Sequence, residues 1–472
     1  MLLARMQGIE AVNGADLLFR LDRLEIYEHD IIGVTGKNGS GKTTLLNMLA
    51  GRRAPDAGTV SAYASLSYLE QFTGEAPQGG LSGGEITKAY LSEALGAGAP
   101  LLLLDEPTSN LDISAIRLLE KQILGYNGGI VLISHDRKLL ENCCTKILDI
   151  ENQEARLYDC GYADFVSLKQ QEAERGQFLY EQYNKERRRL LESIRETQAK
   201  SKSVRKAPKR MGNSEARLHK RKAGERMESV EAGANALKTR LEKLEVHKQP
   251  KKQRRIGIGL ENISERYRGR FIIECEGLSV GFGERILFEN AAFRIKTGAK
   301  VILIGDNGCG KTTLIKKILE PGVAEIKSHA KNIAYYSQGL DMLDTGASIL
   351  ANVLDGSAFT ELEARNILGR LDIRRDAVGK RVGYISGGER VKVCFAKIFT
   401  QGADLIILDE PTNYLDISTA QALEDIIKEY DGTVLAVSHD RSFAGNISDC
   451  VLEIKNRRVE YRAAKFGHEL KI

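Results

Sequence analysis

The chain has 472 residues, of which 42% are hydrophobic and 28% are charged, a balance typical of globular proteins and not of disordered ones. That length predicts two or three domains, and no apolar run approaches the roughly 20 residues that a membrane-spanning helix requires. The first residues lack the basic leader and apolar core of a secretory signal, and seven scattered cysteines without a C-x-x-C pair disfavour a disulfide framework or a zinc site. We therefore expect a cytoplasmic protein.

Four short motifs occur twice in the same order, which indicates an internal duplication. They are a glycine-rich loop at 36–43 and 305–312, Ser-Gly-Gly-Glu at 82–85 and 386–389, Asp-Glu-Pro-Thr at 105–108 and 409–412, and Ser-His-Asp-Arg at 134–137 and 438–441. The first aspartate follows the residue before Ser-Gly-Gly-Glu by 24 positions in both halves, and the histidine follows that aspartate by 30. Chance does not keep four motifs in register twice, so the chain contains two copies of one domain.

Each copy is predicted to be an α/β domain. A short apolar strand, at 31–35 and at 301–304, leads into each glycine-rich loop, and a helix is expected to follow the loop. Later apolar strands end at the repeated aspartate and at the serine of Ser-His-Asp-Arg. An open parallel sheet collects functional groups at the carboxyl ends of its strands, and these residues stand at such ends.

The glycine-rich loops match G-x-x-x-x-G-K-T, the pattern of a phosphate-binding loop. Glycines allow successive backbone N–H groups to point at a phosphate, and the following helix N-terminus adds positive potential. Lys42 and Lys311 are expected to reach the β- and γ-phosphates of ATP, while Thr43 and Thr312 are expected to ligate Mg²⁺. The predicted ATP-binding residues of the two loops are Gly36, Asn38, Gly39, Ser40, Gly41, Lys42, Thr43 and Thr44, and Gly305, Asn307, Gly308, Cys309, Gly310, Lys311, Thr312 and Thr313.

The Ser-Gly-Gly-Glu segments separate this chain from generic phosphate-loop ATPases. They resemble the signature of the ATP-binding-cassette (ABC) superfamily, in which the signature of one domain caps the ATP held by its partner. The resemblance implies two composite sites that close on ATP and open on hydrolysis. One would pair Lys42 with Ser386, Gly387 and Gly388, and the other would pair Lys311 with Ser82, Gly83 and Gly84.

Two residue types in each half suit magnesium. Asp105 and Asp409 close apolar strands, where a carboxylate can act as a metal ligand beside the phosphate loop. Gln71 and Gln338 lie 35 and 33 positions after the first glycine of each loop, and we expect them to sense the γ-phosphate and Mg²⁺. The predicted cofactors are therefore ATP and Mg²⁺.

The residues expected to act on the attacking water follow the magnesium aspartates. Glu106 and Glu410 stand one position after them, where a carboxylate can polarise water. His135 and His439 follow the next strand and are expected to contact the γ-phosphate. A single glutamate or histidine is more often solvated or structural, but both residues recur in matched register.

A basic segment separates the two copies. Residues 164–255 contain 26 Lys and Arg against 13 Asp and Glu, a net charge of +13, so the rest of the chain carries −8 within the total of +5. Helices are predicted at 165–206 and 214–247, with a break at 207–213, which together form an αα-hairpin. Its apolar seam is expected at Phe178, Leu179, Tyr183, Leu190, Leu191 and Ile194, facing Leu237, Leu241 and Leu244. The predicted domains are nucleotide-binding cassette one (1–163), the hairpin linker (164–255) and nucleotide-binding cassette two (256–472).

The predicted hairpin tip is strongly basic. Between positions 198 and 222 there are ten basic residues and one acid, Glu215. A solvated helical face is the alternative, but like charges this close cannot pair with one another, and backbone contacts to folded RNA explain them better. The expected RNA contacts are Lys200, Lys202, Arg205, Lys206, Lys209, Arg210, Arg217, Lys220, Arg221 and Lys222.

Taken together, these features resemble the ABC-F family of ribosome-associated translation ATPases, over almost the whole chain. Its marks are the glutamate that ends each signature, the Asp-Glu-Pro-Thr-(Ser/Asn)-x-Leu-Asp extension, and Tyr-Asp-Cys-Gly-Tyr at 158–162. Segments 24–27, 37–40 and 389–393 are most similar to the Vga-type antibiotic-resistance branch. Only ten positions separate Gln71 from residue 81, against 47 in the second half, so cassette one is expected to have a reduced helical subdomain.

The resemblance implies a monomer whose two cassettes dimerise within one chain, with no membrane and no transmembrane subunit. In its ATP-bound closed state it would bind the bacterial ribosome at the tRNA exit site, with 23S rRNA and P-site tRNA as partners. It would protect the peptidyl-transferase centre from lincosamides, streptogramins A and pleuromutilins until hydrolysis releases it. Two features depart from the family pattern: segment 208–226 is shorter than in well-known resistance members, and Asn13 stands in cassette one where Phe282 can stack on adenine in cassette two.

Three other functions share parts of this pattern. A housekeeping ABC-F translation factor without a resistance role would need the same cassettes and hairpin. A DNA-associated ABC ATPase would use the basic hairpin on duplex DNA. A transporter ATPase would need a membrane partner and the helical subdomain that cassette one is expected to lack.

Overall fold

The structure is a computed structural model. It describes residues 1–14, 16–70, 83–96, 98–109, 111–203, 229–230, 232–243, 270–283, 285–337, 342–373, 375–413 and 415–463, without the side chains of 83–85, 198, 200–203 and 463. Two compact units divide the chain, Met1–Ala163 with Arg254–Ile472, and Asp164–Gln253. No helix in the described part of the chain is both long enough and apolar enough to cross a bilayer.

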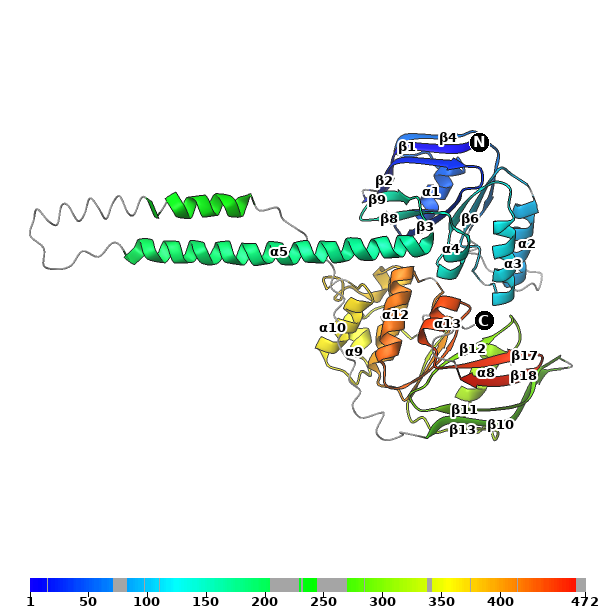
Figure 1. Ribbon diagram of the computed structural model, residues 1–472. Coiled ribbons are helices and arrows are strands. Elements are labelled where there is room, and N and C mark those ends of the chain that lie inside the picture. Colours follow the sequence, from blue (N-terminus) through cyan, green and yellow to red (C-terminus); the bar gives the residue numbers. More distant parts are fainter. Residues whose placement is uncertain are drawn as a thin grey trace, which may run out of the picture. The chain divides into compact units, whose positions relative to one another are not determined.

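Cassette one is built on a nine-stranded sheet (Figure 1), in the order β4-β1-β2-β9-β8-β3-β7-β6-β5. The strands are β1 (Leu2–Asn13), β2 (Asp16–Tyr27), β3 (Ile31–Gly36), β4 (Ala57–Ala62), β5 (Leu66–Leu69), β6 (Leu101–Asp105), β7 (Gly129–Ile133), β8 (Lys146–Glu151) and β9 (Glu154–Tyr158). β3, β5, β6, β7 and β8 run parallel, and every residue of β6 and β7 is buried. Continuous apolar runs are what parallel strands covered on both faces require.

The described part of cassette one also contains the helices α1 (Lys42–Leu49), α2 (Gly83–Gly96), α3 (Ile113–Leu124) and α4 (Arg137–Cys143). α1 follows β3 through the glycine-rich loop, and α3 and α4 follow β6 and β7. Asp112 caps α3 and Asp136 caps α4, each by accepting from backbone N–H groups of the first turn. These strand-to-helix connections bring the repeated motifs to one edge of the sheet.

Cassette two repeats this arrangement in two sheets, β11-β10-β13 and β14-β15-β16-β12-β17-β18. The strands are β10 (Phe271–Phe282), β11 (Arg285–Lys296), β12 (Lys300–Gly305), β13 (Ile326–Ser328), β14 (Ile333–Tyr336), β15 (Leu405–Asp409), β16 (Thr433–Val437), β17 (Cys450–Lys455) and β18 (Arg458–Ala463). In cassette one, a single residue pair, Arg20 with Glu154, joins the two corresponding sheets into one. The equivalent link in cassette two is a backbone hydrogen bond from Glu289 to Arg457. The predicted duplication of an α/β domain is therefore present.

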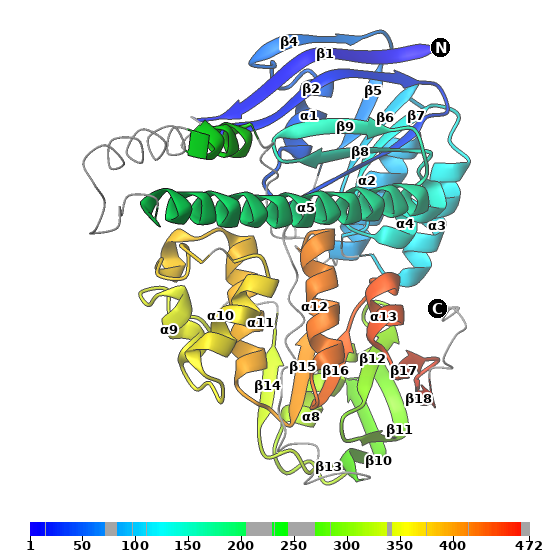
Figure 2. The ribbon, with the colours of Figure 1, turned by 60° about the vertical axis from the view of Figure 1, so that its left-hand side comes forward.

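Cassette two also carries a helical subdomain between β14 and α11 (Figure 2). The described helices of cassette two are α8 (Lys311–Leu319), α9 (Ile349–Leu354), α10 (Glu361–Arg370), the 3-10 turn η1 (Val382–Tyr384), α11 (Gly387–Thr400), α12 (Ile417–Glu429) and α13 (Arg441–Ile447). Its α9, α10 and η1 form the subdomain. In cassette one only residues 70–82 connect β5 to α2, and 71–82 lie outside the described residues.

The second unit contains α5 (Tyr162–Ser203), a single helix of 42 residues that starts three residues before the predicted 165. A second helical segment is described at 229–230 and 232–243, and its Arg240 donates to Glu186 of α5 (3.1 Å). Leu190 and Ile194 are buried as expected for the seam, but Phe178 is 59% exposed. Leu179 is exposed as well, whereas Tyr183, Leu191, Leu237 and Leu241 are half-buried. Phe178 and Leu179 are therefore not in a buried seam, because apolar spacing alone does not reveal where a partner helix lies. The break and most of the predicted tip lie outside the described residues.

Candidate functional site

Two cavities, of about 580 and about 620 Å³, lie where the repeated motifs gather, and both volumes suit a nucleotide-sized ligand. Both are lined by residues of both cassettes. Cavity one brings together the predicted residues Asn38, Gly39, Gly41, Lys42, Thr43, Thr44, Asp105, Glu106, His135, Ser386 and Gly388. Cavity two brings together Asn307, Gly308, Gly310, Lys311, Thr312, Thr313, Asp409, Glu410, His439 and Phe282.

The phosphate loops have the backbone that their glycines allow. Gly41, directly before the lysine, has φ 98°, and a Cβ there would lie 2.8 Å from the ring of Phe19. Lys42 Nζ donates to Gly36 O (2.9 Å) and Lys37 O (3.0 Å), so the side chain folds back over its own loop. Burial lowers the pKa of Lys42, and the nearby carboxylates of Glu106 and Asp105 oppose that effect. The loop therefore places a buried cation beside a helix N-terminus, and both features favour phosphate binding.

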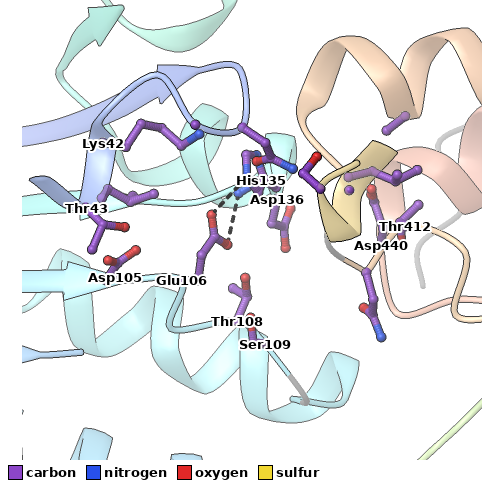
Figure 3. Close-up of a pocket in the computed structure, with 18 of the residues that line it drawn as sticks. Lys42, Thr43, Asp105, Glu106, Thr108, Ser109, His135, Asp136, Thr412 and Asp440 are labelled. Atoms are coloured by element: carbon purple, nitrogen blue, oxygen red, sulfur yellow. Dashed lines mark hydrogen bonds and ion pairs between the residues drawn. The ribbon is translucent and has the colours of Figure 1, made fainter. Parts of the chain in front are cut away.

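The residues predicted to hold magnesium meet beside each lysine. Thr312 Oγ1 donates to Asp409 Oδ2 (3.2 Å), and Thr43 makes the same hydrogen bond to Asp105. Figure 3 shows Thr43 and Asp105 next to each other below Lys42. Asp105 Oδ2 is buried and has no hydrogen-bond partner among the described residues. A hydroxyl and a carboxylate oxygen in this arrangement fit Mg²⁺, which prefers oxygen ligands.

Each predicted catalytic glutamate faces the histidine of its own cassette, and Figure 3 shows the pair of cassette one. Glu106 Oε1 lies 3.3 Å from His135 Nε2, and the backbone N–H of His135 donates to Glu106 Oε2 (3.3 Å). The corresponding distances for Glu410 and His439 are 3.4 and 3.3 Å. Both glutamates have φ 50°, a left-handed backbone that a glutamate rarely adopts. Strain of this kind is concentrated at functional sites.

The electrostatics of these pairs are matched as well. Burial raises the pKa of Glu106 to about 8 and of Glu410 to about 8, and the adjacent lysine of each phosphate loop opposes the shift. Burial lowers the pKa of His135 to about 3 and of His439 to about 4, so both imidazoles are neutral near pH 7. A carboxyl group poised near neutral pH beside a neutral imidazole suits proton transfer from water.

Residues of the opposite cassette complete cavity one. Ser386 caps α11, and a Cβ on Gly388 would lie 3.7 Å from Asn38 Nδ2 of the phosphate loop. The N-terminus of this 14-residue helix adds positive potential on the side opposite Lys42. The backbone N–H of Asn38 also donates to Asp416 Oδ2 (3.2 Å), and Asn307 makes a longer contact to Asp112 Oδ2 (3.5 Å) in cavity two. Both aspartates end the repeated Asp-Glu-Pro-Thr-(Ser/Asn)-x-Leu-Asp segment, but the sequence alone did not predict a role for them.

The two cavities differ at the ends where the sequence predicts that the base binds. Cavity one is lined there by Asn13 and Leu18, whereas cavity two has Phe282, Arg285 and Leu287. Phe282 is 66% exposed, so its ring is available for stacking. Sequence reasoning had placed Asn13 and Phe282 at comparable positions but did not identify the other three residues. Thr108 and Thr412, which also line cavity one, were likewise missed although both stand in the repeated Asp-Glu-Pro-Thr segment.

Some predicted residues do not line a cavity or cannot be placed. Gly36, Gly305, Ser40, Cys309 and Gly387 are described but line neither cavity. Gly36 stands where β3 ends, and a Cβ there would lie 2.6 Å from Ile150 O, which explains the glycine by close packing. Gly83 and Gly84 begin α2, and Lys200 and Lys202 belong to α5. Gln71, Ser82, Gln338, Arg205, Lys206, Lys209, Arg210, Arg217, Lys220, Arg221 and Lys222 lie outside the described residues.

Comparison with known proteins agrees with the fold. The model of the family described as ABC transporter matches residues 20–72 and 288–413. A crystal structure of the archaeal ribosome recycling factor aABCE1 with the ribosomal stalk protein aP1 shares the fold. Its TM-score is 0.65 with 19% identity, over 98% of this chain and 91% of that one. This likeness confirms the predicted fold class.

Two full-length relatives specify the family. Ribosome protection protein VmlR of Bacillus subtilis (strain 168) is 32% identical, over 94% of this chain and 85% of the relative. Erythromycin resistance ATP-binding protein MsrA of Staphylococcus epidermidis is 31% identical, over 93% of this chain and 95% of the relative. Together with the paired cassettes, these similarities show that the chain belongs to the ABC-F family of ATPases.

Proposed function

We propose that this ATPase is a cytoplasmic ribosome-protection factor. With ATP in both cavities the closed protein binds the bacterial ribosome at the tRNA exit site, and its linker, residues 164–255, contacts 23S rRNA and P-site tRNA. Bound there, it disfavours lincosamides, streptogramins A and pleuromutilins at the peptidyl-transferase centre, and hydrolysis releases it. Cassettes 1–163 and 256–472 supply the two ATP sites within a monomer.

The observation that carries this proposal is that both cavities are lined from both cassettes. Lys42 shares cavity one with Ser386, so a triphosphate there would contact the two cassettes at once. Binding energy from both sides favours the closed state, and loss of the γ-phosphate removes part of it. The basic linker suits a polyanionic partner of that closed state. The similarity to VmlR, a ribosome protection protein, and to MsrA, an erythromycin resistance protein, supports protection of the ribosome from drugs.

In this proposal each hydrolytic step uses residues of a single cassette. Lys42 binds the β- and γ-phosphates, and Glu106 orients the attacking water and takes up its proton. The backbone N–H of His135 donates to Glu106 Oε2 (3.3 Å) and holds that carboxyl group in place, so the single N–H of the neutral His135 ring can donate to the γ-phosphate. Lys311, Glu410 and His439 do the same in cavity two.

Magnesium would be held by Thr43 and Asp105 in cavity one and by Thr312 and Asp409 in cavity two. Bound there, Mg²⁺ would neutralise charge on the β- and γ-phosphates. The buried, unpartnered Oδ2 of Asp105 supports this assignment in cavity one. Gln71 and Gln338 remain proposed additional ligands.

The ribosome proposal is tested by trapping the closed state. The Glu106→Gln, Glu410→Gln double variant should bind ATP without turning it over, and with ATP it should co-sediment with purified 70S ribosomes. The matched control is Lys42→Ala, Lys311→Ala, which should not co-sediment because it lacks the phosphate-binding cations. Equal co-sedimentation of both variants, or retention of the trapped variant on duplex DNA in place of ribosomes, would contradict the proposal.

The proposed contacts between the linker and ribosomal RNA are tested by removing basic side chains. Replacing Lys209, Arg210, Lys220 and Arg221 with Gln should weaken ribosome binding and flatten its dependence on salt concentration, because fewer phosphates are neutralised. The control is the same replacement at Arg187, Arg188 and Arg189, three exposed arginines of α5 outside the predicted tip. An equal loss for both sets would indicate non-specific attraction to RNA.

Drug protection is tested separately in a drug-sensitive bacterium. Expression of the parent protein should raise the inhibitory concentrations of a lincosamide and a pleuromutilin, while Lys42→Ala, Lys311→Ala should not. Erythromycin is included because MsrA is named for resistance to it. Unchanged susceptibility to all of these drugs, with ATP-dependent ribosome binding intact, would favour a housekeeping translation factor.

A further inference from the structure

Two buried Arg–Glu ion pairs join the cassettes in the same arrangement, and Arg441 also lies 3.7 Å from Asp136 of cassette one. Arg137 at the start of α4 pairs with Glu424 in α12, and Arg441 at the start of α13 pairs with Glu120 in α3. The side chains of Arg137 and Glu424 are only 10% and 5% exposed, and those of Arg441 and Glu120 are 12% and 12% exposed. None of these four described side chains lines either cavity.

Each arginine is rigidly connected to a histidine that lines a cavity. Arg137 stands two residues after His135, and Asp136 lies between them. The backbone N–H of Asp136 donates to Ser134 Oγ (3.0 Å), while Asp136 Oδ1 accepts from the backbone of Lys138 (2.9 Å) and Leu139 (3.1 Å). This cap fixes the first turn of α4 relative to His135. A force on the Arg137 side chain is therefore transmitted to the histidine.

The glutamate at the other end of each pair is connected to the opposite phosphate loop. Asp416, the cap of α12, accepts from the backbone N–H of Asn38, and Glu424 follows eight residues later in α12. Eight residues of helix span about 12 Å, so the two contacts lie roughly that far apart along α12. Helix α12 of cassette two therefore contacts cassette one twice, at the phosphate loop and beside the histidine. Helix α3 does the same with Asp112 and Glu120 toward cassette two.

A buried Arg–Glu pair of this kind is formed only when its partners meet. Removing one partner leaves an uncompensated buried charge, which is strongly unfavourable. Asn446 donates to Glu424 (2.9 Å) and Asn142 donates to Glu120 (3.1 Å), so each carboxylate has a further hydrogen bond inside its own cassette. α4 and α13 lie side by side in Figures 1 and 2, which places both pairs next to each other in the interface.

We propose that Glu424 and Glu120 are positioning residues for ATP hydrolysis in the opposite cassette. Glu424 holds Arg137, and through it His135 and Glu106, in the geometry that cavity one needs for hydrolysis. Glu120 holds Arg441, and through it His439 and Glu410, for cavity two. Each site then becomes competent only after the opposite cassette has docked. The inference rests on the proposed roles of the Glu–His pairs.

The test isolates one cavity at a time. In a Glu410→Gln background only cavity one turns over, and adding Glu424→Gln should lower its kcat by on the order of ten- to a hundred-fold, with little change in KM for ATP. Glu120→Gln should lower kcat of cavity two when Glu106→Gln is the background, and it should affect cavity one less than Glu424→Gln does, because the Arg441 side chain that it releases reaches Asp136 only at 3.7 Å. Glutamine has the shape of glutamate, so each variant should fold, which its melting temperature checks.

The matched control is Glu429→Gln, also on α12. Glu429 pairs with Arg370 (2.6 and 3.1 Å) inside cassette two, so this variant removes an Arg–Glu pair of similar chemistry without touching the interface. Equal losses for both cavities, a raised KM in place of a lowered kcat, or an equal effect of Glu429→Gln would overturn the inference. If Glu106→Gln itself fails to stop turnover in the Glu410→Gln background, the site assignment fails. If it stops turnover and Glu424→Gln has no effect, only the positioning role fails.

Discussion

The two cassettes match closely around the phosphates. Lys42 Nζ lies 2.9 Å from Gly36 O and Lys311 Nζ lies 2.8 Å from Gly305 O. The glutamates of both halves share φ 50°, and each lies within 3.4 Å of its histidine. The residues predicted to bind phosphate and to activate water therefore have the same geometry in both copies of the duplicated domain.

Away from the phosphates the same two cassettes differ. Asn13 stands in cavity one where Phe282 stands in cavity two, and Ser40 of the first phosphate loop is replaced by Cys309 in the second. Cassette two has a helical subdomain, whereas a connection of thirteen residues, 70–82, spans the equivalent place in cassette one. The residues predicted to contact the base, and the helical subdomain, can therefore differ between the cassettes while the arrangement of lysine, glutamate and histidine stays the same.

The largest effect is expected from replacing the two glutamates, which tests whether their matched geometry gives matched rates of ATP hydrolysis. Glu106→Gln or Glu410→Gln should each slow hydrolysis in its own cavity by about 100- to 10,000-fold, the range for loss of a general base. ATP binding should be nearly unchanged, because the lost carboxylate acts on water and not on the phosphates. Single-turnover assays with the other cavity disabled measure each site. A large loss from one substitution and none from the other would show that the two halves are chemically unequal.

A smaller effect is expected at the base-binding ends, where the halves differ. Phe282→Ala should weaken ATP binding in cavity two about tenfold, since stacking of a base on an aromatic ring contributes roughly 1–3 kcal/mol. Asn13→Phe should strengthen ATP binding in cavity one, because it adds an aromatic ring for stacking. Titration with fluorescent ATP and GTP, with the opposite phosphate-loop lysine replaced by Ala, measures both changes. If Phe282→Ala left ATP affinity unchanged, Phe282 would not distinguish base binding in cavity two from that in cavity one.

Local sequence patterns predicted what depends on local geometry. The loop glycines, Lys42 and Glu106 belong to motifs whose spacing alone indicated a phosphate site, and the cavity brings Lys42 and Glu106 together. The start of α5 was predicted to within three residues because helical periodicity is also local.

Contacts across the interface could not be predicted in this way. Arg137 and Glu424 are 287 positions apart, and Asn38 and Asp416 are 378 apart. Whether such residues meet depends on how two folded cassettes dock, and an arginine or glutamate in a helix has the same local pattern on a solvated face. Phe178 shows the converse case, because its helical spacing indicated burial although the side chain is 59% exposed.

The smallest expected effect concerns the helical subdomain of cassette two. Thr360 caps α10 in a capping box: its Oγ1 accepts from the backbone of Glu363 (3.4 Å), and Glu363 accepts from the backbone of Thr360 (2.8 Å). Thr360→Ala should lower the free energy of unfolding by about 1 kcal/mol, whereas Thr360→Ser, which keeps the hydroxyl, should restore most of it. Denaturant unfolding measures the loss. Because α10 lies outside both cavities, kcat at each site should change less than about twofold. A larger fall at cavity one alone would mean that the subdomain tunes the signature at Ser386, and cassette two's extra helices would then belong to the hydrolytic machinery.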